Sequence, residues 1–277
     1  MAKVNVVNVS DITVTSIETI TAFDILTGEF KWVLDELQNA TISNAQETTD
    51  ITGKQGRLLN TLKRNKSVTI TGNNGLISGG LLSTQVGGTF ENKETSVMFP
   101  DYLEVNGNTA TSTYKAVGTA GNEIASVYIH NTDGTLGTVL TQGAEVAEGV
   151  FTYDPNTKEL KFNEGDIADG TEISAYYFRK INGSVLDNMS DQYSEKVELY
   201  IDAFGEDKCT NVYRIQFHIP KADFNGNFDI EFGDNQSVHA FEARSLAGAS
   251  CGHIGTGAAT LWTYTVFGED APDVENP

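Results

Sequence analysis

Cysteine and proline are scarce in this chain of 277 residues, which contains two cysteines and five prolines against 27 glycines. Two cysteines cannot build the disulfide framework that stabilises small secreted domains. We expect Cys209 and Cys251 to be buried or half-buried apolar residues, with a disulfide or a metal ligand as the alternatives. Little proline together with much glycine is typical of strands joined by turns and disfavours a helical protein.

Basic residues are also few. The chain has 18 lysines and arginines against 38 aspartates and glutamates, so its formal net charge is −20. Proteins that bind nucleic acid gain much of their affinity by neutralising phosphates with Lys and Arg, and anionic membrane surfaces attract the same side chains. The charge therefore argues against an ordinary nucleic-acid binder and against a protein that binds a membrane surface.

Long hydrophobic runs are missing as well. No stretch approaches the roughly 18 apolar residues that a transmembrane helix requires. The first residues contain no charged segment followed by an apolar run, so we expect no secretory signal and reduced cysteines. Nevertheless, 39% of the residues are hydrophobic and they are spread along the chain, which argues against disorder.

Alternation of apolar and polar residues dominates the chain and predicts a mainly β fold. Explicit turn sequences separate short alternating segments within residues 103–181. We expect one β domain over residues 1–277, with residues 103–181 as a candidate inserted β module. The predicted strands outside that module are residues 4–9, two strands within 23–34, a strand from Ile42, 68–71, 197–201, 213–219, 228–232 and 261–267.

Two segments have local signals of their own. Residues 23–34 fit two short strands around the turn at residues 26–29, although apolar residues from Phe30 to Leu37 also fit a helical stripe. Ser78 is a candidate N-cap for a short helix over residues 79–86, which would end at Gly87.

No motif in the chain predicts catalysis or a bound cofactor. Residues 248–252 match G-x-S-x-G around Ser250, but no helix-forming segment follows, and no acid precedes His253 in the order that a catalytic triad needs. The segment from Asp223 to Asp234 resembles a calcium loop, but its glycine is misplaced and its flanks are predicted strands. The four histidines show no metal-ligand spacing. We therefore expect no enzyme, no cofactor and no metal site.

Five of the 18 basic residues gather within 13 positions. They are Lys54, Arg57, Lys63, Arg64 and Lys66. Leu58, Leu62 and the alternating residues 68–71 look like the arms of a long protruding hairpin, which would carry this cluster. Lysines on such a hairpin can deter unwanted edge pairing. Alternatively, a basic hairpin on an acidic body is drawn to the acidic surface of another copy. The charges alone do not decide between these two interpretations.

The chain resembles the major tail tube proteins of long-tailed bacteriophages. Three groups of turn and strand patterns carry the resemblance and together span most of the chain. The first group comprises residues 22–29 (AFDILTGE), 52–56 (TGKQG) and 66–72 (KSVTITG). The second comprises residues 149–155 (GVFTYDP), 160–162 (LKF) and 169–173 (DGTEI). The third comprises residues 219–228 (IPKADFNGNF) and 237–243 (SVHAFEA).

The resemblance implies an antiparallel β-barrel or sandwich with one short helix, assembled as hexameric rings that stack into a hollow tail tube. It implies that the long hairpin with Lys54, Arg57, Lys63, Arg64 and Lys66 reaches the adjoining ring. The implied partners are further copies of the chain, other tail proteins (terminator, tape measure, baseplate or sheath) and DNA as a cargo that is not bound, with no membrane. The implied location is the virion tail, after assembly in the host cytoplasm.

Such a tube must conduct DNA without holding it, and an acidic lumen would repel the phosphate backbone. Three alternatives remain at this stage. The first is another virion structural or decoration protein. The second is a β-sandwich surface adhesin that binds a partner or a glycan, and the third is a hydrolase that uses Ser250 or a pair of acids.

Overall fold

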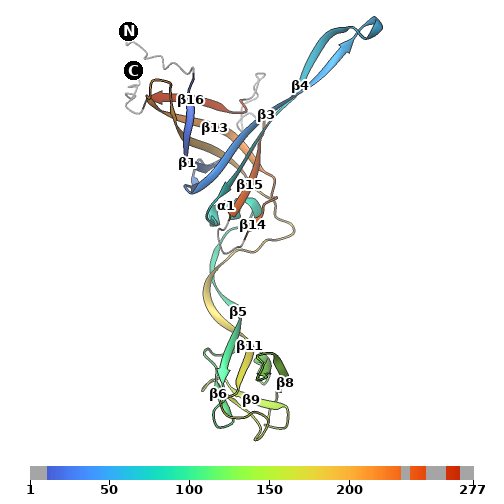
Figure 1. The fold of residues 1–277 in the computed structure, drawn as a ribbon, viewed down its shortest axis with the longest axis vertical. Helices are drawn as coiled ribbons and strands as arrows, with labels where there is room; N and C mark the ends of the chain where they lie inside the picture. Colours follow the sequence, from blue (N-terminus) through green and yellow to red (C-terminus); the bar gives the residue numbers. More distant parts are fainter. Residues whose placement is uncertain (1–10, 232–237, 248–259, 269–277) are drawn as a thin grey trace. The chain divides into compact units, whose positions relative to one another are not determined.

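The computed structural model describes residues 11–231, 238–247 and 260–268, and the chain divides into two units (Figure 1). Unit 1 comprises residues 1–90 and 186–277, and unit 2 comprises residues 91–185. Strands dominate the described residues, and α1 (Gly79–Val86) is the one α-helix among them. The predicted mainly β fold with one short helix and a long hairpin is thereby confirmed.

Unit 1 contains one large antiparallel sheet. Its strand order is β2-β1-β12-β13-β15-β4-β3, with β16 added beside β13 and β14 beside β15. The first half of β13 pairs with β16 and its end pairs with β15, so the sheet branches at this strand. The strands are β1 (Thr13–Asp24), β2 (Phe30–Leu34), β3 (Leu37–Thr52), β4 (Leu58–Asn74), β12 (Lys196–Glu206), β13 (Val212–Phe224), β14 (Ile230–Glu231), β15 (Val238–Ser245) and β16 (Thr263–Gly268).

The core of unit 1 lies on one face of this sheet. Ile20, Leu199 and Ile219 come from three adjacent strands and are fully buried, because apolar residues at alternate positions point to the same face. Leu81 of α1 and Trp32 of β2 pack into the same cluster. The helix and the short strand β2 therefore close the core of the sheet.

The helix begins and ends where its sequence predicts. The Ser78 hydroxyl accepts a hydrogen bond from the Leu81 backbone N–H at 3.3 Å, and Gly87 terminates the helix with φ of 73°. A Cβ added at Gly87 would lie 2.0 Å from the Tyr193 carbonyl oxygen, so only glycine fits there. Residues 23–34 form the end of β1, a turn and β2, which confirms the two strands and excludes the helical alternative.

The pairing of the long hairpin corrects the sequence-based interpretation. Leu58, Leu62 and Val68 all lie on one strand, β4, rather than on two arms, and the other arm is β3. The tip is a short 3₁₀ turn, η1 (Lys54–Gly56). The correction has a physical reason, because the chain reverses at Gly53 to Gly56, where Gly56 has φ of 73°, and Leu58 to Val68 then continue in one strand.

Several other expectations have specific outcomes. The predicted strand at 228–232 is described only as β14 (Ile230–Glu231), and the predicted strand at residues 4–9 lies outside the described residues. Cys209 is exposed, contrary to the expectation that it is buried, and Cys251 lies outside the described residues.

Unit 2 is a second β-sheet with its own core. The strand order is β5-β11-β7-β8-β9-β10-β6, and every pair is antiparallel except the short parallel contact between β8 and β9. The unit includes all of residues 103–181, and its other residues, 91–102 and 182–185, belong to β5 and β11. The strands are β5 (Glu91–Glu104), β6 (Thr109–Thr111), β7 (Ile124–His130), β8 (Leu136–Gln142), β9 (Val150–Asp154), β10 (Glu159–Lys161) and β11 (Glu172–Val185).

A buried polar network lies beside the core of unit 2. The Tyr177 hydroxyl donates to Asp101 Oδ2 at 2.6 Å, and the Thr113 backbone N–H and hydroxyl also donate to this carboxylate. Tyr177 is fully buried and Asp101 is 4% exposed. Burial, followed by the hydrogen bond to Asp101, raises the pKa of Tyr177.

We predict that Tyr177→Phe lowers the free energy of unfolding by about 2 kcal/mol, because the buried carboxylate loses a charge-assisted hydrogen bond. Urea denaturation measures the effect, and hydrogen exchange of β5 and β11 amides localises it. Tyr102→Phe is the matched control, because Tyr102 is 68% exposed on the neighbouring strand. Equal midpoints for the two variants would contradict the assigned role of the network.

His239 of β15 connects the sheet of unit 1 to the helix. It is fully buried, accepts a 3.3 Å hydrogen bond at Nδ1 from the Ser78 backbone N–H, and contacts Gln85 Oε1 through Nε2 at 2.7 Å. These partners require a neutral ring with its proton on Nε2. Burial lowers the pKa of His239 from its ordinary value.

We predict that unit 1 loses stability as the pH falls below about 6.5, the ordinary histidine pKa, because the unfolded chain then binds a proton that folded His239 excludes. The dependence reaches at most about 1.4 kcal/mol per pH unit. Denaturation at pH 7 and pH 5 should show a smaller pH difference in His239→Asn than in the unmodified protein. An unchanged difference would show that another group titrates.

Candidate assembly site

The hairpin of β3 and β4 extends beyond the rest of its sheet as a two-stranded ribbon (Figure 1). Strand β15 covers β4 only from Val68 to Asn74, so residues 45–67 pair only with each other among the described strands. We call residues 45–67 the arm. An isolated two-stranded ribbon is marginally stable in water because it has no third strand and no core. The arm therefore exposes backbone edges and side chains that another surface could cover.

The local sequence explains the shape of the arm. At the tip, Gly56 has φ of 73°, and the Gly53 backbone N–H donates to the Arg57 carbonyl at 2.8 Å to close the turn. The register shifts between Ala45 and Glu47, opposite Asn65, whose φ is 47°. Asparagine tolerates this left-handed conformation, and the resulting bulge increases the twist of the ribbon.

All five basic residues singled out in the sequence lie on the arm and are exposed. Lys54 is in the tip and Arg57 follows it, and the other three are Lys63, Arg64 and Lys66 of β4. None of the five makes an ion pair with another residue in the described ranges. Arg64 lies opposite Glu47, but that carboxylate accepts from Asn65 Nδ2 at 2.6 Å.

The arm reverses the charge of the chain. It contains five basic residues and two acids, Glu47 and Asp50, whereas the remainder contains 13 basic residues and 36 acids. The arm and the body therefore attract each other electrostatically, and exposure leaves this attraction sensitive to salt.

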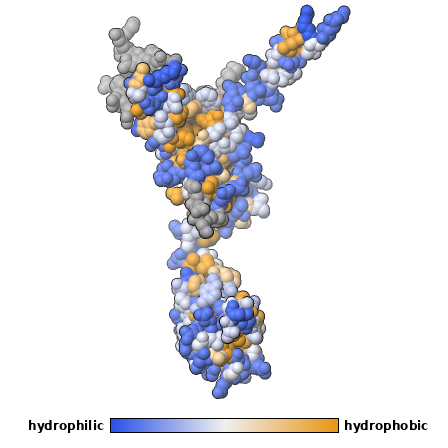
Figure 2. All heavy atoms as spheres, viewed as in Figure 1, coloured by the Kyte–Doolittle hydropathy of each residue, from blue (hydrophilic) through white to orange (hydrophobic). Residues whose placement is uncertain are grey.

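The tip also carries an apolar cluster that the charge pattern did not reveal. Ile51, Leu58 and Leu59 are 41%, 56% and 57% exposed, and Figure 2 shows hydrophobic residues near the tip among hydrophilic ones. We call these three residues the apolar tip. In the sequence, the adjacent residues Leu58 and Leu59 follow the turn glycines Gly53 and Gly56, and this pattern is the signal from which the apolar tip could have been predicted. Exposed large aliphatic side chains at the end of a projection are typical of a docking element.

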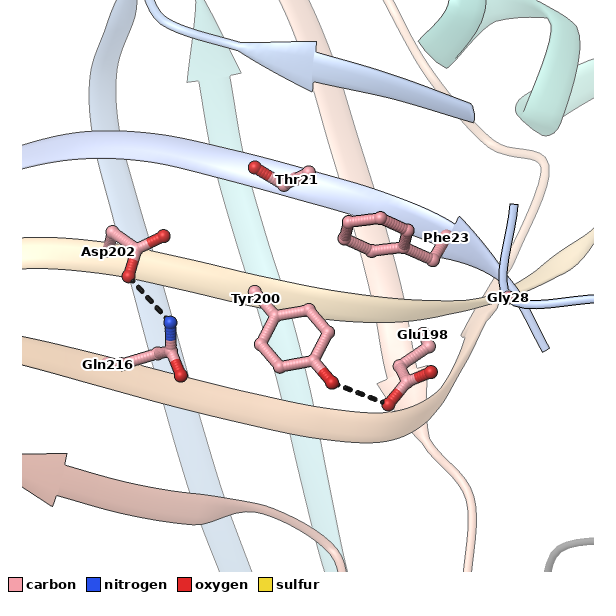
Figure 3. Close-up of a pocket in the computed structure, with 7 residues that line it drawn as sticks. All are labelled: Thr21, Phe23, Gly28, Glu198, Tyr200, Asp202 and Gln216. Carbon is pink, nitrogen blue, oxygen red and sulfur yellow. Dashed lines mark hydrogen bonds between the residues drawn. The ribbon is translucent and has the colours of Figure 1, made fainter. Parts of the chain in front are cut away.

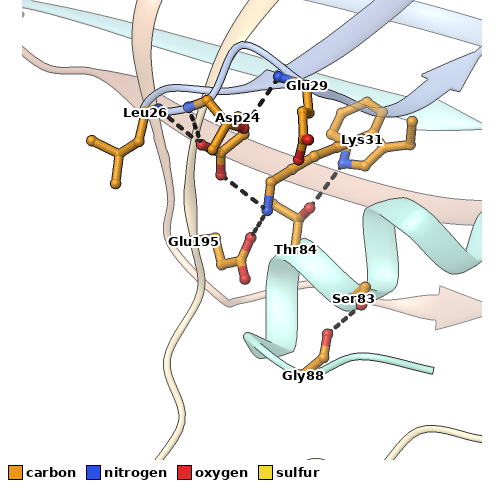
Figure 4. Close-up of polar contacts among 10 residues, drawn as sticks. Asp24, Leu26, Glu29, Lys31, Ser83, Thr84, Gly88 and Glu195 are labelled. Atoms are coloured by element: carbon orange, nitrogen blue, oxygen red, sulfur yellow. Dashed lines mark hydrogen bonds and ion pairs between the residues drawn. The ribbon is translucent and has the colours of Figure 1, made fainter. Parts of the chain in front are cut away.

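Polar contacts fix the turn between β1 and β2 against the helix (Figure 4). Asp24 Oδ1 accepts from the Leu26 and Thr27 backbone N–H groups at 2.8 and 2.9 Å, and these bonds lower the pKa of Asp24. Lys31 bridges Asp24 and Glu195, and the Trp32 indole N–H donates to Thr84 Oγ1 at 2.8 Å. The contacts join the turn and β2 to α1 and to Glu195, the residue before β12.

A shallow hollow lies on the sheet face opposite the core, between β1, β12 and β13 (Figure 3). Glu198 Oε1 accepts from the Tyr200 hydroxyl at 2.9 Å and contacts His218 Nε2 at 2.6 Å. Gln216 Nε2 donates to Asp202 Oδ1 at 2.9 Å. Each contact joins residues of this face to one another, and none of the described residues that line the hollow is a serine or a cysteine. The arrangement holds the carboxylates of Glu198 and Asp202 on the sheet surface through hydrogen bonds from neighbouring side chains.

The other motifs from the sequence are placed only in part. Ser250 and His253 lie outside the described residues, as does Asp234 of the calcium-like segment. Asp223 belongs to β13, and Asn225 Oδ1 accepts from the Asn227 backbone N–H in a turn. Within the described ranges, no three His, Cys, Asp or Glu side chains group as metal ligands. Among those residues, no helix is both long enough and apolar enough to cross a membrane.

Comparisons with known proteins agree with this architecture. The model of the YomU/Tube protein family matches residues 12–259, which include all of unit 2, the arm and most of unit 1. A search of curated proteins gave no match.

Proposed function

The chain belongs to the YomU/Tube protein family, in agreement with its resemblance to phage tail tube proteins, and we propose that it is the subunit of a self-assembling tail tube. In this proposal, copies of the chain close into hexameric rings, and the rings stack into a hollow tube that conducts DNA towards the host. The role is structural and not catalytic.

The arm is the observation that carries this proposal. A two-stranded ribbon gains stability when another surface covers it, and this one carries an apolar tip and five basic side chains that make no ion pair with a described residue. A second copy of the chain supplies an acidic surface, because the chain outside the arm has 36 acids against 13 basic residues. Attraction between the arm and that surface offsets the repulsion between subunits of like net charge.

The same acidity suits a channel for DNA. Each lysine or arginine that faces a lumen would add a phosphate contact, and the contacts would accumulate along the tube. A wall rich in carboxylates repels the phosphate backbone instead. DNA is then a cargo that the tube does not bind, and the basic residues of the arm are occupied by contacts between subunits.

The proposed partners follow from the tube architecture. Further copies of the chain form the rings, and other tail proteins (a terminator, a tape measure, and a baseplate or sheath) meet the ends, the lumen or the outside. The family places the chain with virion tail proteins. Assembly in the host cytoplasm is part of the proposal, as is the absence of a membrane partner.

We predict that reversing three arm charges together, Arg57→Glu, Lys63→Glu and Arg64→Glu, prevents rings from stacking while the subunit stays folded. All three side chains are exposed and have no ion pair with a described residue, so the fold does not depend on them. The readout is the fraction of protein in tubes by negative-stain microscopy.

The matched control reverses Lys115, Lys161 and Lys221, which changes the net charge by the same amount outside the arm. This control should form tubes, because it leaves the arm intact. Tubes of normal length from the arm variant would contradict the role of the arm, and loss of tubes in both variants would indicate a general charge effect.

We also predict that assembled tubes do not retard duplex DNA in a gel at low salt, because the net charge opposes phosphate binding. The variant with Arg57→Glu, Lys63→Glu and Arg64→Glu serves as the comparison, because these three residues of its arm can no longer attract DNA. Tight retardation by the tubes that weakens with added salt would contradict a repulsive lumen.

A further inference from the structure

We propose that the tip of the arm docks into a specific hollow at the other end of the same hairpin in a neighbouring copy. This inference rests on the proposed function, since it identifies the surface that receives the arm. The hollow is lined by Asp35, Glu36, Leu37, Gln38, Gly75 and Leu76, and its volume is about 390 Å³. We call it the acceptor hollow.

The acceptor hollow is preformed by backbone contacts between two segments. One is the connection between β2 and β3, and the other follows the end of β4. The Gly75 backbone N–H donates to the Glu36 carbonyl at 2.8 Å and joins the two segments. Asn74 Nδ2 donates to the Leu76 carbonyl at 2.6 Å and fixes the second one. A rigid receiving surface costs little entropy when a partner docks.

The chemistry of the acceptor hollow matches the tip in two independent ways. Asp35 and Glu36 are exposed and make no ion pair within the described parts of the chain, so they are available to Lys54 and Arg57. Leu76 is 59% exposed, and its neighbour Ile77 is 45% exposed. These aliphatic side chains can bury Leu58 and Leu59 of the apolar tip, and burial of apolar surface supplies most of the driving force for association.

The tip cannot fill the acceptor hollow of its own chain. Leu37 and Thr52 are the two ends of the 16-residue strand β3, which spans about 50 Å at 3.3 Å per residue. The hollow lies at the first end and the tip at the second. A β-ribbon paired along this length cannot fold back on itself, so the occupant of the hollow is a second copy.

This placement explains how stacking could continue without limit. Donor and acceptor are different surfaces at opposite ends of one element, so each docked copy presents a new tip or a new hollow to the next. Heterologous contacts of this kind form an open polymer unless the rotation closes them into a ring. Contacts between identical patches would stop at a dimer.

Cysteine cross-linking tests the proposed contact directly. The chain carries Leu58→Cys and Leu76→Cys, with Cys209→Ser and Cys251→Ser to remove the native thiols. A disulfide forms only when the two Cα atoms come within about 7 Å. Oxidised tubes should give a ladder of dimers, trimers and higher species on a non-reducing gel. Leu58→Cys paired with Leu136→Cys, which is exposed in unit 2, should give no ladder.

The outcomes separate this inference from the proposed function. Tubes that form normally but give no ladder would overturn the acceptor hollow and leave the tail tube intact. If the protein forms no tubes at all, the result contradicts the proposed function, and the inference that rests on it is overturned as well. A ladder in the Leu136→Cys control as strong as in the test pair would show non-specific collision and overturn the assignment.

A charge exchange keeps the inference testable if the cysteine variants assemble poorly. Asp35→Lys with Glu36→Lys should abolish stacking, and so should Lys54→Glu with Arg57→Glu. Combining all four substitutions should restore stacking, since the attraction is re-formed with opposite signs. If the combined variant stacks no better than either pair, the proposed contact is wrong.

Discussion

A β-ribbon that extends beyond its sheet keeps only its own partner strand as a neighbour. The proposed assembly of the protein depends on this lack of further contacts. In the part of the chain that the structure describes, the arm of residues 45–67 has no third strand and no core beneath it, and its apolar tip is exposed. The strands of unit 1 that anchor it are, by contrast, packed around fully buried residues such as Ile20 and Leu199. A stable body thus presents an element that gains stability mainly through contact with another molecule.

The distribution of charge along the chain supports the same account. The chain as a whole carries a net charge of −20, yet its arm holds five basic residues against two acids. A uniform distribution would leave the subunits repelling each other at every contact. Concentrating the positive charge on one projection allows attraction at the contact between copies while the remaining surface stays acidic. Acidity that opposes DNA binding is therefore compatible with a protein whose proposed cargo is DNA.

The sequence predicts local features of this fold better than it predicts the pairing of segments that lie far apart in the chain. The helix at residues 79–86 could be predicted because Ser78 and Gly87 act on neighbouring backbone groups. The partner of β4 was misassigned because strand pairing depends on residues far along the chain, and the alternating pattern of Leu58, Leu62 and Val68 does not reveal that they share one strand. The basic cluster was visible as charge density. The acceptor hollow was not, since residues 35–38 meet residues 75–76 only after β3 and β4 have paired.

The central claim is that the purified chain assembles by itself, and negative-stain microscopy over a range of protein and salt concentrations tests it most directly. The account predicts rings and then stacked tubes as the protein concentration rises, with fewer tubes at high salt because the contacts of the exposed arm are screened. Monodisperse single subunits at every concentration and every salt would contradict it.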